Sequence, residues 1–397
     1  MSFTIHTKEY GTALPGVRML LQNKDQFGYY TVGNLKTYSK IEAIELHTKT
    51  GTHPQWHFND EIFSMHDWRV EPTASLEELY AIRARQIRDK YDYIVLFFSG
   101  GADSENMLRT FLRNDIRVDE IANFWALEGD KEYNTHFNSE IYNIAAPTVL
   151  KILETHPTIK HRIIDLSDII AGLYDDPNRK FDFLYDMNIM FSPNNYARSF
   201  LRERIADYQE IIASGKKLCF VWGSEKPRVS VDQGRYCINF FDILDNVVSP
   251  RTQRLNRDWE HDEIFYWSPD LPELIIKQAH TIKHFLKTTT VKEHDFVSEK
   301  PKANFGSITH NGSTKYLTSH GLHKVIYGID NFHHVKPSST FLSERDRWFL
   351  KNPTHLASSI NYINGVGKMA HIVPTYWVND SFKKGLKAQI SRPYWLE

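Results

Sequence analysis

Residues 93–112 read YIVLFFSGGADSENMLRTFL, an apolar run that meets two glycines and then continues with a helical pattern. The apolar and β-branched residues of 93–98 are typical of a strand that is buried on both faces. Gly100 and Gly101 permit a sharp turn, and the helix is predicted to begin at Asp103 or Ser104. This stretch therefore constrains the fold to one in which a buried strand passes directly into a helix.

The same alternation continues downstream. Further strands are predicted in VDEIANFWAL, HRIIDLSDII and KKLCFVWG, and helices are predicted over about 138–154 and 195–213. Strands that alternate with helices indicate an α/β fold with a parallel, doubly wound sheet, because the connections between parallel strands are right-handed crossovers. In such sheets, ligands bind beyond the carboxyl ends of the strands.

Pattern changes divide the chain into three predicted units. Residues 1–72 are expected to form a small α+β unit, 73–250 the unit with the parallel sheet, and 251–397 a mostly helical C-terminal lobe. Ser75 and Glu78 form a capping box that predicts the start of a helix over 75–91. Gly234 lies between two alternating runs and predicts a β-hairpin. Helices are also expected over 268–288, which begins near a proline, and near 342–360.

Composition narrows the class of protein. The formal charge of -1 and a pI near 7 argue against a protein held to nucleic acid by a broad basic surface. Two cysteines, Cys219 and Cys237, are too few for a disulfide framework, and both lie in apolar runs typical of a core. The N-terminal residues do not have a signal-peptide pattern, and no 18 apolar residues run together. We expect a cytoplasmic protein that does not bind membranes; the oligomeric state is not indicated.

The turn after the first predicted strand has the chemistry of an anion site. Glycines allow the backbone to approach a ligand closely, and free N–H groups at a helix start point toward it. Ser99 and Ser104 add hydroxyl donors. A carboxylate such as Asp103 suits a phosphate site when Mg²⁺ lies between the two charges. The alternative is a tight turn without a ligand, for which glycines alone would be enough.

The segment SGGADS, placed between an apolar strand and a helix, resembles the SGGxDS pyrophosphate loop of the PP-loop ATP pyrophosphatases. The resemblance covers about residues 88–250 and implies an adenine nucleotide alpha hydrolase-like, Rossmann-like fold. It also implies binding of ATP and Mg²⁺, and cleavage of ATP between the α- and β-phosphates. The residues expected to contact the β- and γ-phosphates or the metal are Ser99, Gly100, Gly101, Asp103 and Ser104.

A second charged segment, GSEKPR, follows the predicted strand that ends at Gly223. A parallel sheet would present this segment to the same ligand cleft. We expect Glu225 to bind magnesium, Lys226 to act in catalysis on the pyrophosphate, and Arg228 to contact ATP. A solvated hairpin is the alternative, since charged residues after a strand are common.

Other candidates rest on weaker signals. The resemblance implies that Ala126 and Leu127 contact adenine through backbone atoms and that Glu128 contacts the ribose; a core strand with an exposed acidic turn is equally consistent. It also suggests a catalytic lysine from the C-terminal part, Lys324 or Lys336. The three arginines at 198, 202 and 204 are expected mainly to be solvated, and the alternative is that one of them contacts phosphate or a substrate carboxylate.

The chain has 19 histidines, which raises the question of a metal site. His280 and His284 are four residues apart on a predicted helix, a spacing that places both imidazoles on one face. No carboxylate stands near them in the sequence in the arrangement of a zinc protease. A zinc site is therefore not favoured from the sequence.

Absences narrow the expected function within the resembling superfamily. Residue 2 is a serine, whereas glutamine-dependent asparagine synthetases have a cysteine nucleophile there, and the chain cannot supply a four-cysteine zinc cage. We expect an AMP-forming ligase or amide synthetase that activates a carboxylate or carbonyl oxygen for attack by an amine or ammonia. A nucleic-acid or nucleotide base-modifying enzyme and a non-catalytic ATP sensor remain open. The expected partner is a small-molecule or nucleotide acceptor.

Overall fold

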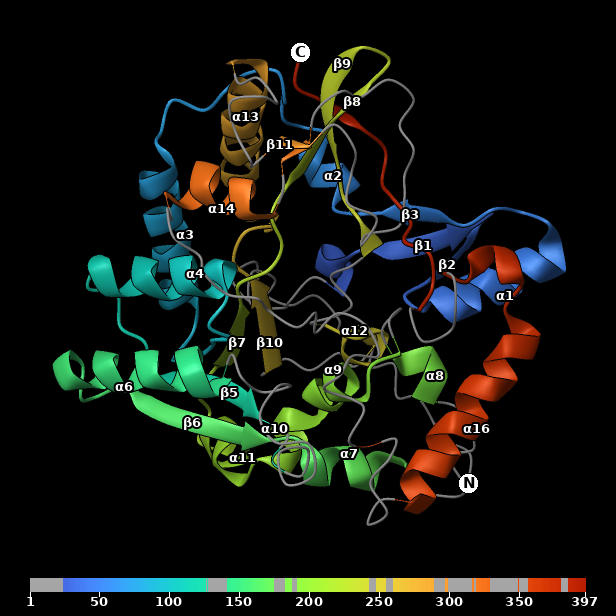
Figure 1. Cartoon of the computed structure of the whole chain (residues 1–397), viewed down its shortest axis with the longest axis horizontal. Coiled ribbons are helices and arrows are strands. Elements are labelled where there is room, and N and C mark those ends of the chain that lie inside the picture. Colours follow the sequence, from blue (N-terminus) through green and yellow to red (C-terminus); the bar gives the residue numbers. More distant parts are fainter. Residues whose placement is uncertain are drawn as a thin grey trace, which may run out of the picture.

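The computed structural model describes residues 24–125, 127, 141–174, 183–187, 191–242, 248–254, 260–288, 297–298, 316–317, 319–328, 349, 356–379 and 385–397. Its centre is a parallel sheet of five strands flanked by helices (Figure 1). In chain order the strands are β4 (Tyr93–Phe97), β5 (Glu120–Trp125), β6 (Lys160–Asp165), β7 (Leu218–Trp222) and β10 (Glu260–Ile264).

The strand order in space is β10-β7-β4-β5-β6, and every neighbouring pair is parallel. From β4 the chain moves outward through β5 to β6, and it then returns to the other side of β4 to form β7 and β10. This order is compatible with a doubly wound α/β fold, in which the direction of winding reverses between β4 and β7. The predicted parallel sheet is confirmed, and its two central strands are almost completely buried.

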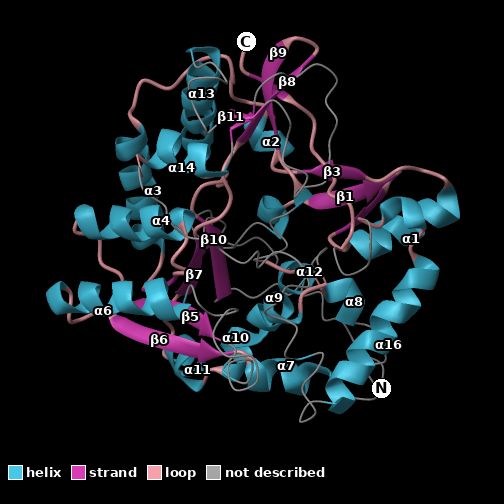
Figure 2. Ribbon diagram, in the orientation of Figure 1, coloured by secondary structure: helices cyan, strands magenta, loops and turns pink. Residues whose placement is uncertain are grey.

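Helices connect the strands of this sheet and cover it (Figure 2). The helical patterns predicted over 195–213 are present as several short segments, and Ile205, which is extended, separates the last two of them. Of the predicted helix 138–154, residues 138–140 lie outside the described residues. The connecting elements are α4 (Ala102–Arg113), the π-helix η3 (Ile141–Ala145), α6 (Ala146–Thr155), α7 (Ser167–Tyr174), α8 (Phe183–Asp186), α9 (Pro193–Ala197), η4 (Arg198–Phe200), α10 (Leu201–Arg204) and α11 (Ala206–Ala213).

The N-terminal part contains a small antiparallel sheet with the strand order β2-β1-β3. Tyr30 and Lys40 from this part both bond to the carboxylate of Asp242, at 2.7 and 2.5 Å, and this ion pair is buried. These bonds attach the N-terminal part to Asp242, which follows the hairpin around Gly234. Its elements are η2 (Lys24–Phe27), β1 (Tyr29–Val32), β2 (Leu35–Thr37), α1 (Lys40–Thr50), β3 (Gln55–His57) and α2 (Asp60–Phe63).

Helix α3 (Leu76–Lys90) begins with the predicted capping box, since Ser75 and Glu78 exchange both bonds. On its buried face, Arg83 donates to Glu263 of β10 at 2.7 Å. Strand β10 was not predicted, because its sequence EHDEI is charged whereas buried parallel strands are usually apolar. The side chains of Asp262 and Glu263 in β10 are instead buried in ion pairs with Arg202 and Arg83. Because β10 lies beyond residue 250, the sheet extends into the segment assigned to the C-terminal lobe.

The predicted hairpin around Gly234 is confirmed and forms a second antiparallel sheet with the C-terminal residues. This hairpin lies near α13 and the C-terminus (Figure 1). Of the predicted helix near 342–360, residues 342–348 and 350–355 lie outside the described residues, and residues 356–360 form the start of α16. The remaining elements are β8 (Arg228–Asp232), β9 (Arg235–Asn239), α12 (Pro250–Arg254), α13 (Pro272–Thr288), β11 (Val297–Ser298), β12 (Tyr316–Leu317), α14 (Ser319–Tyr327), α16 (Leu356–Ile372), η7 (Thr375–Trp377) and β13 (Tyr394–Trp395).

Cys219 in β7 and Cys237 in β9 are both buried and free, as expected for core cysteines. Burial raises the pKa of both thiols, so neither has the character of a reactive thiolate. Across the part of the chain that the structure describes, no helix has the length and apolar character needed to cross a bilayer.

Candidate functional site

The candidate site lies at the carboxyl ends of β4 and β7, which are neighbours in the sheet. Residues 99–104 follow β4, and residues 223–228 follow β7. Because the winding reverses between these two strands, this edge is where such folds have their ligand crevice. The two segments that the sequence singles out are therefore brought together at the point where such folds bind ligands.

The loop after β4 has the backbone geometry of a tight turn into a helix. Gly100 has a φ of 77°, in the left-handed region that favours glycine. A Cβ at this position would also lie 3.2 Å from Ile144 Cγ2 and 3.3 Å from the backbone nitrogen of Ala145. Gly101 is the N-cap of α4 and supplies no side-chain cap, so the first N–H groups of the helix have no partner within it. The helix begins at Ala102, one residue before the predicted start.

The two serines of the loop hold its shape. Ser104 Oγ donates to the Gly101 carbonyl at 2.9 Å and accepts from the Ser99 backbone N–H at 3.2 Å. Ser99 Oγ accepts from the Gly101 N–H at 3.3 Å. These bonds lie within one turn of backbone, and the Ser104 side chain is buried. The hydroxyls therefore fix the position of the N–H groups at the start of α4.

Gly223, the first residue after β7, packs directly on the first turn of α4. A Cβ at this position would lie 2.9 Å from Ser104 Cα and 3.1 Å from the carbonyl oxygen of Asp103. Since these are backbone atoms, a side chain could be accommodated only if the loop or the strand moved. Glycine at 223 therefore sets the spacing between the two halves of the site.

Asp103 is the most highly connected side chain of the loop. Its Oδ2 accepts from Lys226 Nζ at 2.7 Å, its Oδ1 accepts from the Tyr327 hydroxyl at 2.8 Å, and His323 Nε2 lies 3.9 Å away. Burial raises the pKa of Asp103, but the charges of Lys226 and His323 and these two hydrogen bonds lower it by more. The carboxylate is therefore ionised at neutral pH. Its place in the first turn of α4 also suits the helix dipole.

Lys226 brings positive charge to the same point. Burial lowers the pKa of its ammonium, but the neighbouring carboxylates of Asp103 and Glu225 raise it by more, so the net pKa lies above the usual value. Arg228 lies in the field of the same Glu225, and its guanidinium stacks 4.7 Å from the centre of the Phe241 ring. The segment after β7 therefore supplies two cations and one carboxylate beside the loop.

Three aromatic and imidazole side chains complete the surroundings of Asp103, and the sequence did not point to them. The Tyr266 hydroxyl donates to the Asp103 carbonyl at 2.7 Å, and its ring lies 5.4 Å from that of Tyr327. Tyr327 and His323 are one turn apart on α14. Their spacing of four residues in the segment HGLHKVIY was the signal that could have placed both on one face. Helix α14 thus closes the site from the C-terminal lobe.

The remaining predicted residues are placed as follows. The Leu127 N–H donates to Asp165 Oδ1 at 3.1 Å, and its side chain is exposed. Lys324 lies on α14 beside His323, with an exposed side chain. Ala126, Glu128 and Lys336 lie outside the described residues.

Arg202 was expected to be solvated, and this expectation is wrong. Its guanidinium is buried and donates to Asp262 of β10 at 3.0 Å. The Trp222 indole N–H also donates to this carboxylate, at 2.8 Å. Arg202 therefore stabilises the edge strand β10 and does not lie on the exposed face of a helix.

The donors of the site fit Mg²⁺ together with a phosphate. Asp103 is ionised, and each of its oxygens accepts one of the hydrogen bonds described above, although a carboxylate oxygen has two lone pairs. Mg²⁺ prefers such oxygen ligands and is usually held by one or two carboxylates plus substrate phosphates.

Models of known protein families do not match this chain, and a search of curated proteins finds no similar sequence.

Proposed function

We propose that the protein is an ATP-dependent, AMP-forming ligase or amide synthetase with the fold of the PP-loop ATP pyrophosphatases. The observation that carries the proposal is the contact between Asp103 in the loop after β4 and Lys226 in the loop after β7. The pair supports the proposal because it brings together a carboxylate that would bind Mg²⁺ and a cation, next to N–H groups of α4 that have no partner within the helix. A bound polyphosphate needs these three features together.

The β- and γ-phosphates of ATP would lie against the first turn of α4. There, the first N–H groups have no partner within the helix, and the helix dipole favours negative charge. Lys226 and Arg228 would face the same phosphates from the other side of the crevice. Asp103 would hold Mg²⁺, with Glu225 as the second candidate ligand, and the ion would neutralise phosphate charge.

The proposed first step is adenylation of the acceptor. A carboxylate or carbonyl oxygen of the acceptor attacks the α-phosphorus, and the bond between this phosphorus and the α–β bridging oxygen breaks. Pyrophosphate leaves with the electron pair. An amine or ammonia then attacks the activated carbon and displaces AMP. The fixed N–H groups and the Lys226 ammonium stabilise the charge that develops on the departing pyrophosphate, and they do so without reorganisation.

The acceptor would approach from the side of α14. Tyr327 and His323 of this helix reach the Asp103 carboxylate, and Lys324 lies between them in the sequence with an exposed side chain. We assign Lys324 to the acyl-adenylate side of the site. The end of β5, including Leu127, is the proposed edge for the adenine base.

Product analysis tests this function. Purified full-length protein is incubated with ATP, Mg²⁺ and a panel of carboxylate acceptors with ammonia or amines, and the nucleotide products are separated. We expect AMP and pyrophosphate in equal amounts, and about 100-fold less of both products, or none, with Asp103→Asn. Formation of ADP would overturn the proposal, because cleavage would then occur between the β- and γ-phosphates. ATP binding without turnover for any acceptor would support a sensor instead.

A further inference from the structure

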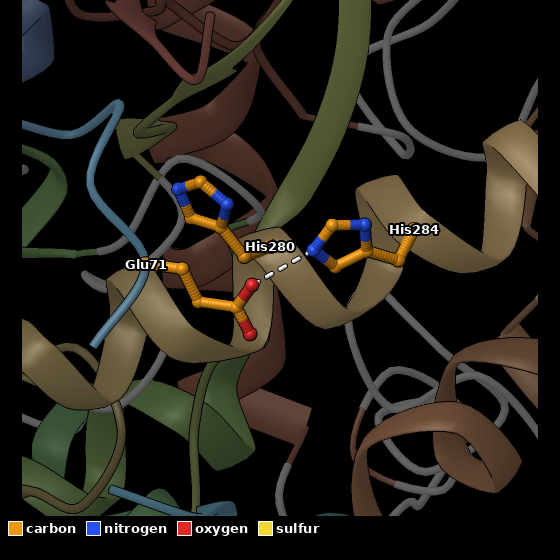
Figure 3. Close-up of side chains that lie close together, drawn as sticks. All are labelled: Glu71, His280 and His284. Atoms are coloured by element: carbon orange, nitrogen blue, oxygen red, sulfur yellow. Dashed lines mark hydrogen bonds and ion pairs between the residues drawn. The ribbon is translucent and has the colours of Figure 1, made fainter. Parts of the chain in front are cut away.

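A second cluster of ligand-type side chains lies away from the loop of Asp103. Glu71, in the segment between α2 and α3, meets His280 and His284 on α13, and one ligand atom from each residue lies within 4.8 Å of the others (Figure 3). The two histidines are one helical turn apart. The carboxylate, which is missing near them in the sequence, is contributed by a segment about 200 residues earlier in the chain.

His280 is held in a fixed orientation and tautomer. Its Nε2 lies 2.8 Å from the backbone carbonyl oxygen of Trp68, and a carbonyl oxygen only accepts. Nε2 therefore carries the hydrogen, and Nδ1 of the neutral ring keeps its lone pair. Figure 3 shows the Nδ1 edge on the side of the ring where Glu71 and His284 lie. A histidine that binds a metal usually donates its other N–H to a carbonyl or carboxylate in this way.

Glu71 is held by a different partner on each oxygen. Lys277 Nζ donates to Oε1 at 2.8 Å and to the Pro72 carbonyl at 3.1 Å. Oε2 faces the imidazoles and lies 2.8 Å from His284 Nε2. Lys277 therefore fixes the carboxylate through one oxygen and leaves the other directed at the two histidines.

The three side chains differ in exposure. His280 is buried, whereas the side chain of His284 is 58% exposed. A cation among them would be anchored on the buried side by His280 and would be open to water on the side of His284. Rotation of this exposed imidazole can bring the donors to the spacing that bonds of about 2.0–2.2 Å require.

We propose that Glu71 Oε2, His280 Nδ1 and a ring nitrogen of His284 form a Zn²⁺ site with water as the fourth ligand. Two imidazoles select zinc over Mg²⁺ or Ca²⁺, which prefer oxygen ligands. The ion would join the segment before α3 to α13. The ammonium groups of Lys277 and Lys283 on the same helix limit the affinity, because their charge opposes a second cation. This proposal does not depend on the proposed function.

A cobalt titration tests the site directly. The full chain is treated with a chelator, dialysed and titrated with Co²⁺, whose visible absorption reports tetrahedral coordination, and Zn²⁺ is then added in competition. His284→Ala and Glu71→Gln remove one ligand each. His371→Ala, which changes an exposed histidine on α16, is the matched control. Circular dichroism verifies that each of the three variants folds.

We expect one equivalent of Co²⁺, displaced by Zn²⁺, and a rise in Tm with Zn²⁺. We expect the affinity to fall about tenfold or more in His284→Ala and Glu71→Gln and to stay unchanged in His371→Ala. Absence of the visible band, or an equal affinity in the wild type and in both ligand variants, would overturn the proposal. No nucleotide is present, so the result stands whether or not the protein cleaves ATP.

Discussion

The ammonium of Lys226 lies 2.7 Å from Oδ2 of Asp103, although 123 residues separate the two in the chain. They meet because β4 and β7 are paired in parallel, so that the loops at their carboxyl ends share one edge of the sheet. The contact therefore joins the loop after β4 to the loop after β7. It also keeps a carboxylate and a cation close to the first turn of α4.

Replacement of Asp103 by asparagine tests the role of its charge. The change keeps the size of the side chain but removes the negative charge proposed to hold Mg²⁺. We expect ATP turnover to fall about 100-fold or more. We expect Tm to change by about 4 °C or less, because Asp103 lies in the first turn of α4 and not in the hydrophobic core. Initial rates and thermal melts provide both values. A rate equal to that of the wild type would remove Asp103 from the site.

Gly223→Ala tests the packing of the two loops. The added methyl group would lie 2.9 Å from Ser104 Cα, so the start of α4 must move. We expect ATP affinity to fall about tenfold and stability to fall by about 1–3 kcal/mol. Gly172→Ala is the control, because Gly172 lies in α7 with no atom within 4 Å of the added position. Equal ATP affinity in the two variants would show that the loop does not bind the phosphates.

Tyr327→Phe tests whether α14 acts on the site. Loss of the hydroxyl removes a hydrogen bond that lowers the pKa of Asp103, so this pKa rises. We therefore expect the acidic limb of the pH–rate profile to move to higher pH, with a rate loss of about three- to tenfold at neutral pH. Tyr376→Phe, at an exposed tyrosine, serves as the comparison. A profile that does not move would limit Tyr327 to a structural role.

The buried ion pair between Arg83 of α3 and Glu263 of β10 predicts that the protein loses stability in acid. Burial raises the pKa of Glu263, but Arg83 and Lys90 lower it by more, to about 2 from the ordinary 4.5. Because the folded-state pKa is depressed, this contribution to stability is complete above pH 4.5 and is lost as the pH falls toward 2. Denaturant unfolding at several pH values measures the loss.

Glu263→Gln should remove this contribution. At neutral pH we expect it to cost about 3–5 kcal/mol, because the buried Arg83 then keeps the more distant Asp270 carboxylate, at 3.4 Å, but loses the buried one. The pH dependence of unfolding below 4.5 should also become shallower than in the wild type. Glu154→Gln, at an exposed position on α6, should leave both properties unchanged. A small cost in both variants would mean that the pair contributes little.

The sequence predicted those features that depend on local pattern. The strand before Ser99, the turn at Gly100 and the capping box at Ser75 follow from neighbouring residues, and the structure confirms them. The rule that parallel strands present their carboxyl ends together was enough to place Asp103 and Lys226 at one edge of the sheet, where they are in contact. Whether this site binds ATP stays a prediction.

Features that depend on distant partners were missed. Strand β10 has charged residues that are compatible with burial only because Arg83 and Arg202 arrive from other helices. Tyr327 reaches Asp103 across 224 residues. Likewise, the spacing of His280 and His284 was visible in the sequence, whereas the carboxylate of Glu71 was not, since no local pattern connects it to α13.

Calorimetric titration of the full chain with ATP and Mg²⁺ tests the central claim, that the loop 99–104 and Lys226 bind the triphosphate. Lys226→Met removes the cation from the crevice, and Lys216→Met removes an exposed one just before β7. We expect one ATP site, with an affinity that falls about tenfold or more in Lys226→Met and stays unchanged in Lys216→Met. No heat of binding in the wild type, or equal affinity in Lys226→Met, would contradict the claim.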